Sequence, residues 1–438
     1  MADIPDKPEG EKDLASPPPA VDTTLNKQRS VFLGISGIPG LSKGKTALLL
    51  GLVLIVVLGS VALLTSQALK RKAAPAHPPV PANSNAAMFG FDLQHTNFNS
   101  TEHILNVANV SRLVSYWMAT TGSYIISSPV VANGIVYIGS YDQKLYALDA
   151  KTGRMLWVHS AKSSIGSSAA IAAGIVYVGS NDHKLYALNA RTGATIWTYT
   201  TGGDIWSSPA VVNAVVYVGS NDGNLYAFNA LTGAVLWSHT TGNFVSSSPA
   251  VINGIIYVGS EDDNLYALDA RTGKTLWSAS VGLAIRVSSP AIANGVVFVG
   301  SEDSQLYAFN ARTGGILWAT HTGGFIHSSP AVANGMVYIG STDHSLTAFA
   351  ANTGKRIWAV HTGAVIDSSP TVANGIVYVG SQDHKLYALD ARAGTTLWTY
   401  TAGDIIDSSP TVANGVVYVG SWDGKLYAFH LPTIAHLP

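Results

Sequence analysis

One position in this chain carries residue types that could bind a ligand or do chemistry. It lies directly before a recurring Ser-Ser pair and returns every 40 residues, once after 41. The residues at this position are Ile126, Gly166, Trp206, Ser246, Arg286 with the additional Val287, His327, Asp367 and Asp407. Two carboxylates and a histidine on successive units could hold a cation or poise a general base. A tryptophan could stack on a planar ligand, and an arginine could pair with a carboxylate.

These residues belong to a repeated unit that first appears as residues 127–157, SSPVVANGIVYIGSYDQKLYALDAKTGRMLW. A Gly-Ser pair and a tryptophan recur in register with it. The tryptophans are Trp117, Trp157, Trp197, Trp237, Trp277, Trp318, Trp358 and Trp398. A period of this length made of short strands is typical of a solenoid, a propeller or an array. Helical periodicity is absent from the unit, which argues against a helical solenoid.

Each unit contains four stretches with strand character, which in the first copy are residues 127–132, 135–139, 145–148 and 154–158. Asn133 and Gly134 predict a two-residue hairpin turn, because both tolerate the positive φ that such a turn needs. Four antiparallel strands per unit make one blade of a β-propeller. The variable position opens the innermost strand, so we expect its side chains to face the mouth of the central channel.

The two ends of the array indicate how it closes. The last unit stops without its tryptophan strand, whereas Trp117 precedes the first complete unit. Pairing of the Trp117 segment with residues 425–429 would complete an eighth blade and hide both sheet edges. We therefore predict an all-β, eight-bladed propeller of four-stranded blades over residues 91–438.

A single transmembrane helix is predicted to precede the propeller. Residues 46–69 carry no charge, and their apolar part is close to the ~20 residues that span a bilayer. A cleaved signal peptide is the alternative, but about 45 residues precede the apolar run, more than such a signal has. Residues 1–45 predict a disordered cytoplasmic tail and residues 70–90 a Pro/Ala-rich linker. Basic residues flank the two ends of this apolar stretch almost equally, so their distribution does not set its orientation. We place the propeller outside the cytoplasm as the more plausible arrangement.

Composition excludes several classes of function. The net charge is −1 with 12% charged residues, so the chain lacks the excess of basic residues that nucleic-acid-binding proteins usually have. The chain has no cysteine, which excludes disulfides, thiol catalysis and zinc-thiolate sites. No Ser-His-Asp spacing, phosphate-cradling glycine loop or paired metal-binding histidines is present, and we expect no metal site and no catalytic residue.

Residues 88–116, called the lead-in here, precede the first complete unit. The lead-in and the repeat motif resemble the quinoprotein, or PQQ-like repeat, β-propellers. The lead-in residues that match this family in character are Phe91, Asp92, His95, Thr96, Asn109, Val110 and Leu113. The repeat signature is met by Ala147, Asp149, Ala150, Thr152, Gly153 and Trp157. The resemblance implies that each of the eight tryptophans docks against a neighbouring blade, a structural role that suits a large ring recurring once per unit.

The family includes quinone-dependent dehydrogenases and non-enzymatic scaffolds, so two functions stay open. The first is a membrane-anchored interaction or ligand-binding module with a protein partner on one face. The second is a PQQ-dependent oxidoreductase or quinone-binding sensor, with PQQ and calcium held by Trp206, Arg286, His327, Asp367 and Asp407. The chain lacks the adjacent-cysteine disulfide and the long insertions of such enzymes, which favours the first. A structural role in the cell envelope, with solvated mouth residues that bind nothing, also stays open.

Overall fold

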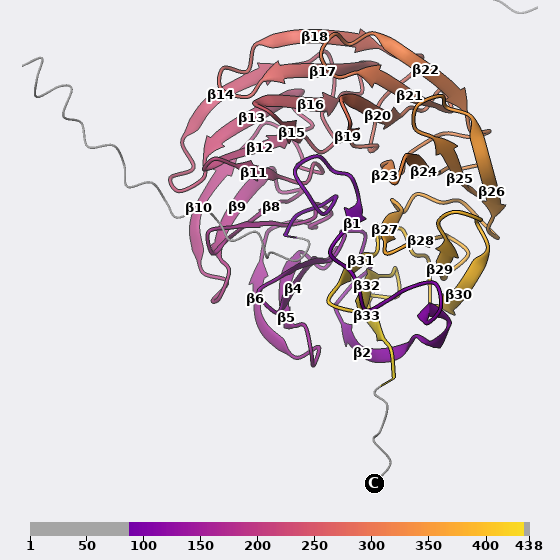
Figure 1. The fold of residues 1–438 in the computed structure, drawn as a ribbon. Coiled ribbons are helices and arrows are strands. Elements are labelled where there is room, and N and C mark those ends of the chain that lie inside the picture. Colours follow the sequence, from indigo (N-terminus) through magenta and orange to yellow (C-terminus); the bar gives the residue numbers. More distant parts are fainter. Residues whose placement is uncertain (1–86, 433–438) are drawn as a thin grey trace, which may run out of the picture. The chain divides into compact units, whose positions relative to one another are not determined.

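The computed structural model describes residues 87–432, and these form eight antiparallel sheets arranged as the blades of a ring (Figure 1). The predicted all-β, eight-bladed propeller is confirmed. Blades 1 to 7 are β3–β6, β7–β10, β11–β14, β15–β18, β19–β22, β23–β26 and β27–β30, and blade 8 is β31–β33 with β2. A short strand of the lead-in, β1 (Phe98–Asn99), adds to blade 7 in parallel with β27, and a 3₁₀-helix, η1 (Val110–Arg112), precedes β2.

Within each blade the strands follow one another outward from the channel. The inner strands are β3 (Val130–Ala132), β7 (Ala170–Ala172), β11 (Ala210–Val212), β15 (Ala250–Ile252), β19 (Ala291–Ala293), β23 (Ala331–Ala333), β27 (Thr371–Ala373) and β31 (Thr411–Ala413). The second strands are β4 (Ile135–Gly139), β8 (Ile175–Gly179), β12 (Val215–Gly219), β16 (Ile255–Gly259), β20 (Val296–Gly300), β24 (Met336–Gly340), β28 (Ile376–Gly380) and β32 (Val416–Gly420).

The third strands are β5 (Lys144–Asp149), β9 (Lys184–Asn189), β13 (Asn224–Asn229), β17 (Asn264–Asp269), β21 (Gln305–Asn310), β25 (Ser345–Ala350), β29 (Lys385–Asp390) and β33 (Lys425–His430). The outer strands are β6 (Met155–Ser160), β10 (Thr195–Thr200), β14 (Val235–Thr240), β18 (Thr275–Ser280), β22 (Ile316–His321), β26 (Arg356–His361), β30 (Thr396–Thr401) and β2 (Val114–Thr120). The hairpin turn between the first two strands has the predicted positive φ, 52° at Asn133 and 76° at Gly134.

The ring closes by the predicted pairing. Strand β2 pairs antiparallel with β33, with Trp117 opposite Ala428 and Thr120 opposite Lys425. The N-terminal strand thus becomes the outer strand of blade 8, beside the three C-terminal strands. Closure pairs the exposed edge of β33, which would otherwise template association with another chain.

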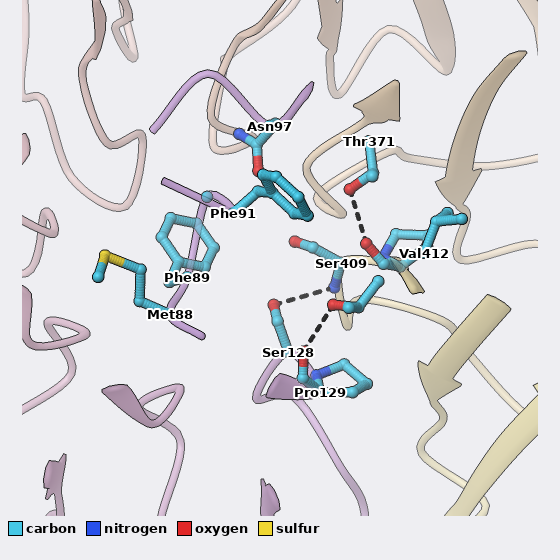
Figure 2. Close-up of a pocket in the computed structure, with 12 residues that line it drawn as sticks. Met88, Phe89, Phe91, Asn97, Ser128, Pro129, Thr371, Ser409 and Val412 are labelled. Carbon is cyan, nitrogen blue, oxygen red and sulfur yellow. Dashed lines mark hydrogen bonds between the residues drawn. The ribbon is translucent and has the colours of Figure 1, made fainter. Parts of the chain in front are cut away.

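A circle of serine hydrogen bonds links the inner ends of all eight blades. In each blade the backbone N–H of the second serine of the Ser-Ser pair donates to the serine Oγ at the same position in the next blade, from Ser128 N–H to Ser168 Oγ (2.8 Å) onward. The bond from Ser409 N–H to Ser128 Oγ (3.3 Å) completes the circle (Figure 2). These serines are buried, so each bond satisfies a backbone donor that water does not reach.

The repeated tryptophans lie at the blade seams. The indole Nε1–H of Trp117 in blade 8 donates to the carbonyl of Ala150 in blade 1 (3.1 Å), and the next six tryptophans make the same bond to the following blade. Trp398 donates instead to Leu113 of the lead-in (3.1 Å), because blade 8 takes its outer strand from there. Gly153 packs on the ring of Trp117 so closely that an added Cβ would lie 2.6 Å from the indole.

The lead-in crosses the end of the ring that carries the Asn-Gly turns. The central residue of an inner strand points its N–H into the channel, and lead-in carbonyls accept five of these donors. The acceptors are Ala87, Leu93, Gln94, Thr96 and Asn97, and the donors lie in blades 2, 4, 5, 6 and 7. In blade 8 the Asn99 side chain donates to Val412 O (2.8 Å). Met88, Phe89 and Phe91 lie near the serine circle in Figure 2, where they line a small cavity with Ser128 and Ser409.

The predicted tail (1–45), transmembrane helix (46–69) and most of the linker (70–90) lie outside the described residues. Between residues 87 and 432, no helix is long and apolar enough to cross a membrane.

The serine circle can be tested by removing one acceptor. The substitution Ser128→Ala leaves the buried N–H of Ser409 without its partner, which costs about 1–3 kcal/mol. We expect a lower thermal unfolding midpoint, measured by circular dichroism, whereas the exposed control substitution Ser100→Ala should change little. Equal midpoints for the two variants would show that the circle does not hold the blades together.

Candidate functional site

The candidate site is the mouth of the channel on the face opposite the lead-in crossing. Two kinds of segment meet there, the loop that enters each inner strand and the turn that follows each Gly-Ser pair. In blade 1 the N–H of Tyr141, in the turn, donates to the carbonyl of Tyr124, in the loop (3.0 Å). Asp142 ties the same segments together, since its Oδ2 accepts from Gly122 N–H (2.8 Å) and its Oδ1 from Lys144 N–H (3.2 Å). In this blade the mouth is therefore built from two short segments that are hydrogen-bonded to each other.

His327 and Asp367 come together from blades 6 and 7. His327 Nδ1 lies 3.1 Å from Asp367 Oδ1, and His327 Nε2 lies 3.3 Å from Glu302 Oε1 in blade 5. Both ring nitrogens thus face a carboxylate. Hydrogen bonding to Asp367, aided by the charges of Asp367 and Glu302, raises the pKa of His327 above its usual range against the opposing effect of burial.

Gln382 joins the two predicted aspartates. Its Nε2 donates to Asp367 Oδ2 (3.0 Å) and to Asp407 Oδ1 (3.2 Å). Burial, with the negative charge of Asp367 as a smaller cause, raises the pKa of Asp407 to about 6. Asp407 is therefore a carboxyl that changes its charge close to neutral pH.

Arg286 lies between two glutamates of the mouth. Its Nε is 3.7 Å from Glu261 Oε1, and its Nη1 is 3.7 Å from Glu302 Oε1. The Arg286 side chain is 58% exposed, so these pairs are worth little in stability. Ser246 extends the network into blade 4, where its hydroxyl donates to Glu261 Oε1 (2.8 Å).

Four of the five predicted ligand-binding residues, Arg286, His327, Asp367 and Asp407, belong to this network. Trp206 stands apart on blade 3, where it is half-buried. Among the described residues no hydrogen bond or ring contact joins Trp206 to the other four.

A stack of three aromatic rings completes the mouth beside blade 8. Tyr124 lies between Tyr141 and Trp422, with ring centroids 4.4 Å and 5.2 Å apart and interplanar angles below 30°. The Nε1 of Trp422 is buried beside Asp407 and makes no hydrogen bond of ordinary geometry in the described part of the chain. These flat faces could receive a planar or cationic group.

Half of the network comes from a position that the sequence-based prediction did not include, the residue directly after each Gly-Ser pair. This residue varies as much as the one before the Ser-Ser pair, and this second position holds Tyr141, Asn181, Asn221, Glu261, Glu302, Thr342, Gln382 and Trp422. Its Glu261, Glu302 and Gln382 supply the partners of the predicted residues. The signal was present in the repeats, and comparing both segments of each unit would have found it.

The charge of the network decides how well it fits a quinone cofactor. Four carboxylates, from Glu261, Glu302, Asp367 and Asp407, face one arginine and one histidine. PQQ is itself a polycarboxylate, so this excess of negative charge opposes its binding. Among residues 87–432 no group of three or more histidines and acidic residues is placed to hold a metal ion that could offset the charge. The charge balance of the described mouth residues therefore weighs against a polycarboxylate ligand.

Two family models match parts of the chain. The model described as "Beta-alanine-activating enzyme, beta-propeller" matches residues 172–374, and the model described as "Outer membrane protein assembly factor BamB" matches residues 114–204 and 342–433. Among curated proteins, no sequence matches the chain.

Several solved structures share the fold. A europium-containing methanol dehydrogenase aligns with a TM-score of 0.71 and 16% identity, covering 80% of this chain and 98% of that chain. BamB from Moraxella catarrhalis aligns with a TM-score of 0.63 and 21% identity, covering 73% and 99%. The quinohemoprotein alcohol dehydrogenase from Comamonas testosteroni aligns with a TM-score of 0.70 and 18% identity, covering 81% and 82%.

These findings define the class of protein, an eight-bladed β-propeller whose residues 114–204 and 342–433 match the BamB model. The predicted resemblance is confirmed at the level of the fold. At such identities the structural neighbours, which include dehydrogenases and BamB, establish nothing finer.

The raised pKa of Asp407 leads to a prediction about stability. Because the folded-state pKa of about 6 exceeds the ordinary value of 3.8, the folded protein holds this proton more tightly than the unfolded chain. Stability is therefore lost as pH rises through the interval from about 4 to 6, and the loss is complete above it. Asp407→Asn should unfold at higher temperature than the wild type at pH 7.5, by the equivalent of ~1–3 kcal/mol, and at nearly the same temperature at pH 4. A melting difference that does not change with pH would contradict the assignment.

Proposed function

We propose that this propeller is an interaction module whose mouth binds a basic segment of a protein partner. The observation that carries the proposal is the polar network of the mouth, which runs without interruption from Ser246 in blade 4 to Asp407 in blade 8. Its carboxylates outnumber its cations, and complementary charge steers a partner and fixes its register.

Exposed apolar side chains on the same face support a protein as the partner. Phe244, Leu283 and Phe325 are 45%, 48% and 50% exposed. They lie in the loops that enter blades 4, 5 and 6, next to the strand ends that carry Ser246 and Arg286. A centre of apolar anchors beside charged groups is the usual composition of a protein interface.

A PQQ-dependent oxidoreductase or quinone-binding sensor is the second candidate. Its support is the likeness of the fold to a methanol dehydrogenase and a quinohemoprotein alcohol dehydrogenase, and the acidic character of the mouth weighs against it. Both candidates would use the same residues, so one set of variants separates them.

A membrane anchor formed by residues 46–69, with the propeller outside the cytoplasm, completes the proposal. Its support is the uncharged, apolar sequence of this stretch.

Binding of a basic peptide tests the proposed mouth. We expect the full chain in detergent at pH 7.5 and low salt to bind a Phe-Arg-Arg-Phe peptide in preference to Phe-Glu-Glu-Phe, measured by isothermal titration calorimetry. The double substitution Asp367→Asn with Asp407→Asn should weaken binding at least fivefold, and salt should weaken it in the wild type.

The control is the double substitution Asp149→Asn with Asp390→Asn, which removes the same number of negative charges from the opposite face. Other units already have asparagine at the equivalent position, as Asn189, Asn229 and Asn310, so the blades should tolerate the change. Equal affinity for both peptides, or an equal loss in the control, would refute the interaction proposal. A saturable melting shift with PQQ and calcium that Asp367→Ala and Asp407→Ala abolish would establish the second candidate instead.

The anchor makes a separate prediction. The full chain should sediment with membranes and resist extraction by alkaline carbonate, whereas a variant with Leu50, Val53 and Ile55 changed to aspartate should be released, because charges at the bilayer centre are costly. Quantitative blotting of the fractions measures this, and an external protease that leaves the propeller intact in whole cells would contradict the orientation.

A further inference from the structure

A groove of about 210 Å³ lies in the wall of the ring, at the seam between blades 8 and 1. Its walls include Ala119 from β2, Ile138 and Tyr146 from blade 1, and Leu148 and Met155 from the same blade. The Met155 side chain is 51% exposed, so the groove is open to solvent beside it. This site is separate from the mouth, and its ligand chemistry does not depend on the proposed function.

The seven other seams show what belongs in this space. The residues equivalent to Ala119 are His159, Tyr199, His239, Ala279, Thr320, Val360 and Tyr400. In four seams this side chain is a ring that packs on the tyrosine equivalent to Tyr146, with centroids 5.2 to 5.9 Å apart. The pairs are His159 with Tyr186, Tyr199 with Tyr226, His239 with Tyr266 and Tyr400 with Tyr427. An aromatic ring on the tyrosine is thus the filling that the chain itself uses.

The three other seams without such a ring differ from this one in the residue at this position or in the residue that faces it. Ala279 and Thr320 face Phe309 and Phe349, where blade 1 has Leu148. Val360 faces Leu389 and fills part of its seam with its own branched side chain. Among the eight seams, only the one between blades 8 and 1 combines alanine with leucine. The groove is therefore the place of a missing ring.

We propose that this groove binds the aromatic ring of a small molecule about the size of a phenol or an imidazole. The ring would take the place that Tyr199 or His159 has in its own seam, tilted against the ring of Tyr146 and between Ala119 and Leu148. Tyr146 is already positioned for this, because its hydroxyl is hydrogen-bonded to Asp142 and its ring cannot turn away without breaking that bond.

The surroundings favour a neutral, largely apolar ring. Where the chain supplies its own imidazole, burial lowers the pKa of both His159 and His239, so the neutral form occupies the seam. The groove walls are mostly aliphatic and aromatic, and no arginine, lysine or carboxylate lines the space. An apolar pocket that excludes water gains most from a flat ring of matching shape.

The test uses p-cresol, the side-chain analogue of tyrosine, on the full chain labelled at its methionine methyl groups. Met155 lines the groove, whereas Met336 is packed in blade 6 and serves as an internal reference. We expect a saturable upfield shift of the Met155 methyl signal, from the ring current of the bound ligand, with a Kd on the order of 1 mM for a ligand of this size. The Met336 signal should not move.

Two substitutions fill the groove with residues that sister seams already use. Ala119→Tyr copies Tyr199, and Leu148→Phe copies Phe228, so both are compatible with the blade. Each should abolish the p-cresol shift at Met155, weakening binding at least tenfold, and should raise the melting temperature of the free protein. Ala119→Ser, which leaves the space open, should keep wild-type binding.

Three outcomes would overturn the proposal. The first is a Met155 signal that does not respond, or does not saturate, by 20 mM p-cresol. The second is an unchanged response in both filled variants. The third is equal displacement of p-cresol by cyclohexanol, which has a similar size but no flat aromatic ring. Because Leu148→Phe fills the groove from the opposite wall, the test stands even if Ala119→Tyr fails to fold.

Discussion

The circle of serine N–H to Oγ bonds is the constraint on which the rest of the structure depends. Each bond joins equivalent atoms 40 or 41 residues apart, and the last one joins Ser409 to Ser128 across the whole length of the array. Because every member is buried, the loss of one bond would leave a backbone N–H that water does not reach. The circle fixes the distance between neighbouring blades at the channel, close to the residues that precede each Ser-Ser pair. The contact between His327 and Asp367 follows from this spacing.

Packing between neighbouring blades varies more in the outer part of the ring than at the channel. The tryptophans set the contact between blades through one indole bond each, but the space beside them is filled by whichever side chains the two strands supply. Four seams are filled by a ring from the chain itself, whereas the seam between blades 8 and 1, where β2 arrives from the lead-in, retains the groove at Ala119. The inner circle thus determines the geometry of the mouth, whereas the seams can differ without disturbing it.

The fold could be predicted almost completely from the sequence, because each of its determinants repeats. The Asn133-Gly134 turn, the strand stretches and the position of Trp117 opposite the last strands all follow from one unit and its truncated final copy. The site could be predicted only in part. Its residues before the Ser-Ser pairs were visible, but their partners Glu302 and Gln382 come from a second segment whose proximity depends on the width of the ring. The groove could not be foreseen, because it depends on how Ala119 of β2 and Leu148 of blade 1 pack together across the seam that closes the ring.

The lead-in has a mechanical consequence. It is bonded to the inner strands of six blades before its end becomes the outer strand of the eighth. Because the lead-in continues into β2 of blade 8, separating blade 8 from blade 1 would also strain the hydrogen bonds between the lead-in and the inner strands. The joint between blades 8 and 1 is therefore coupled through the lead-in to the inner strands of blades 2, 4, 5, 6 and 7.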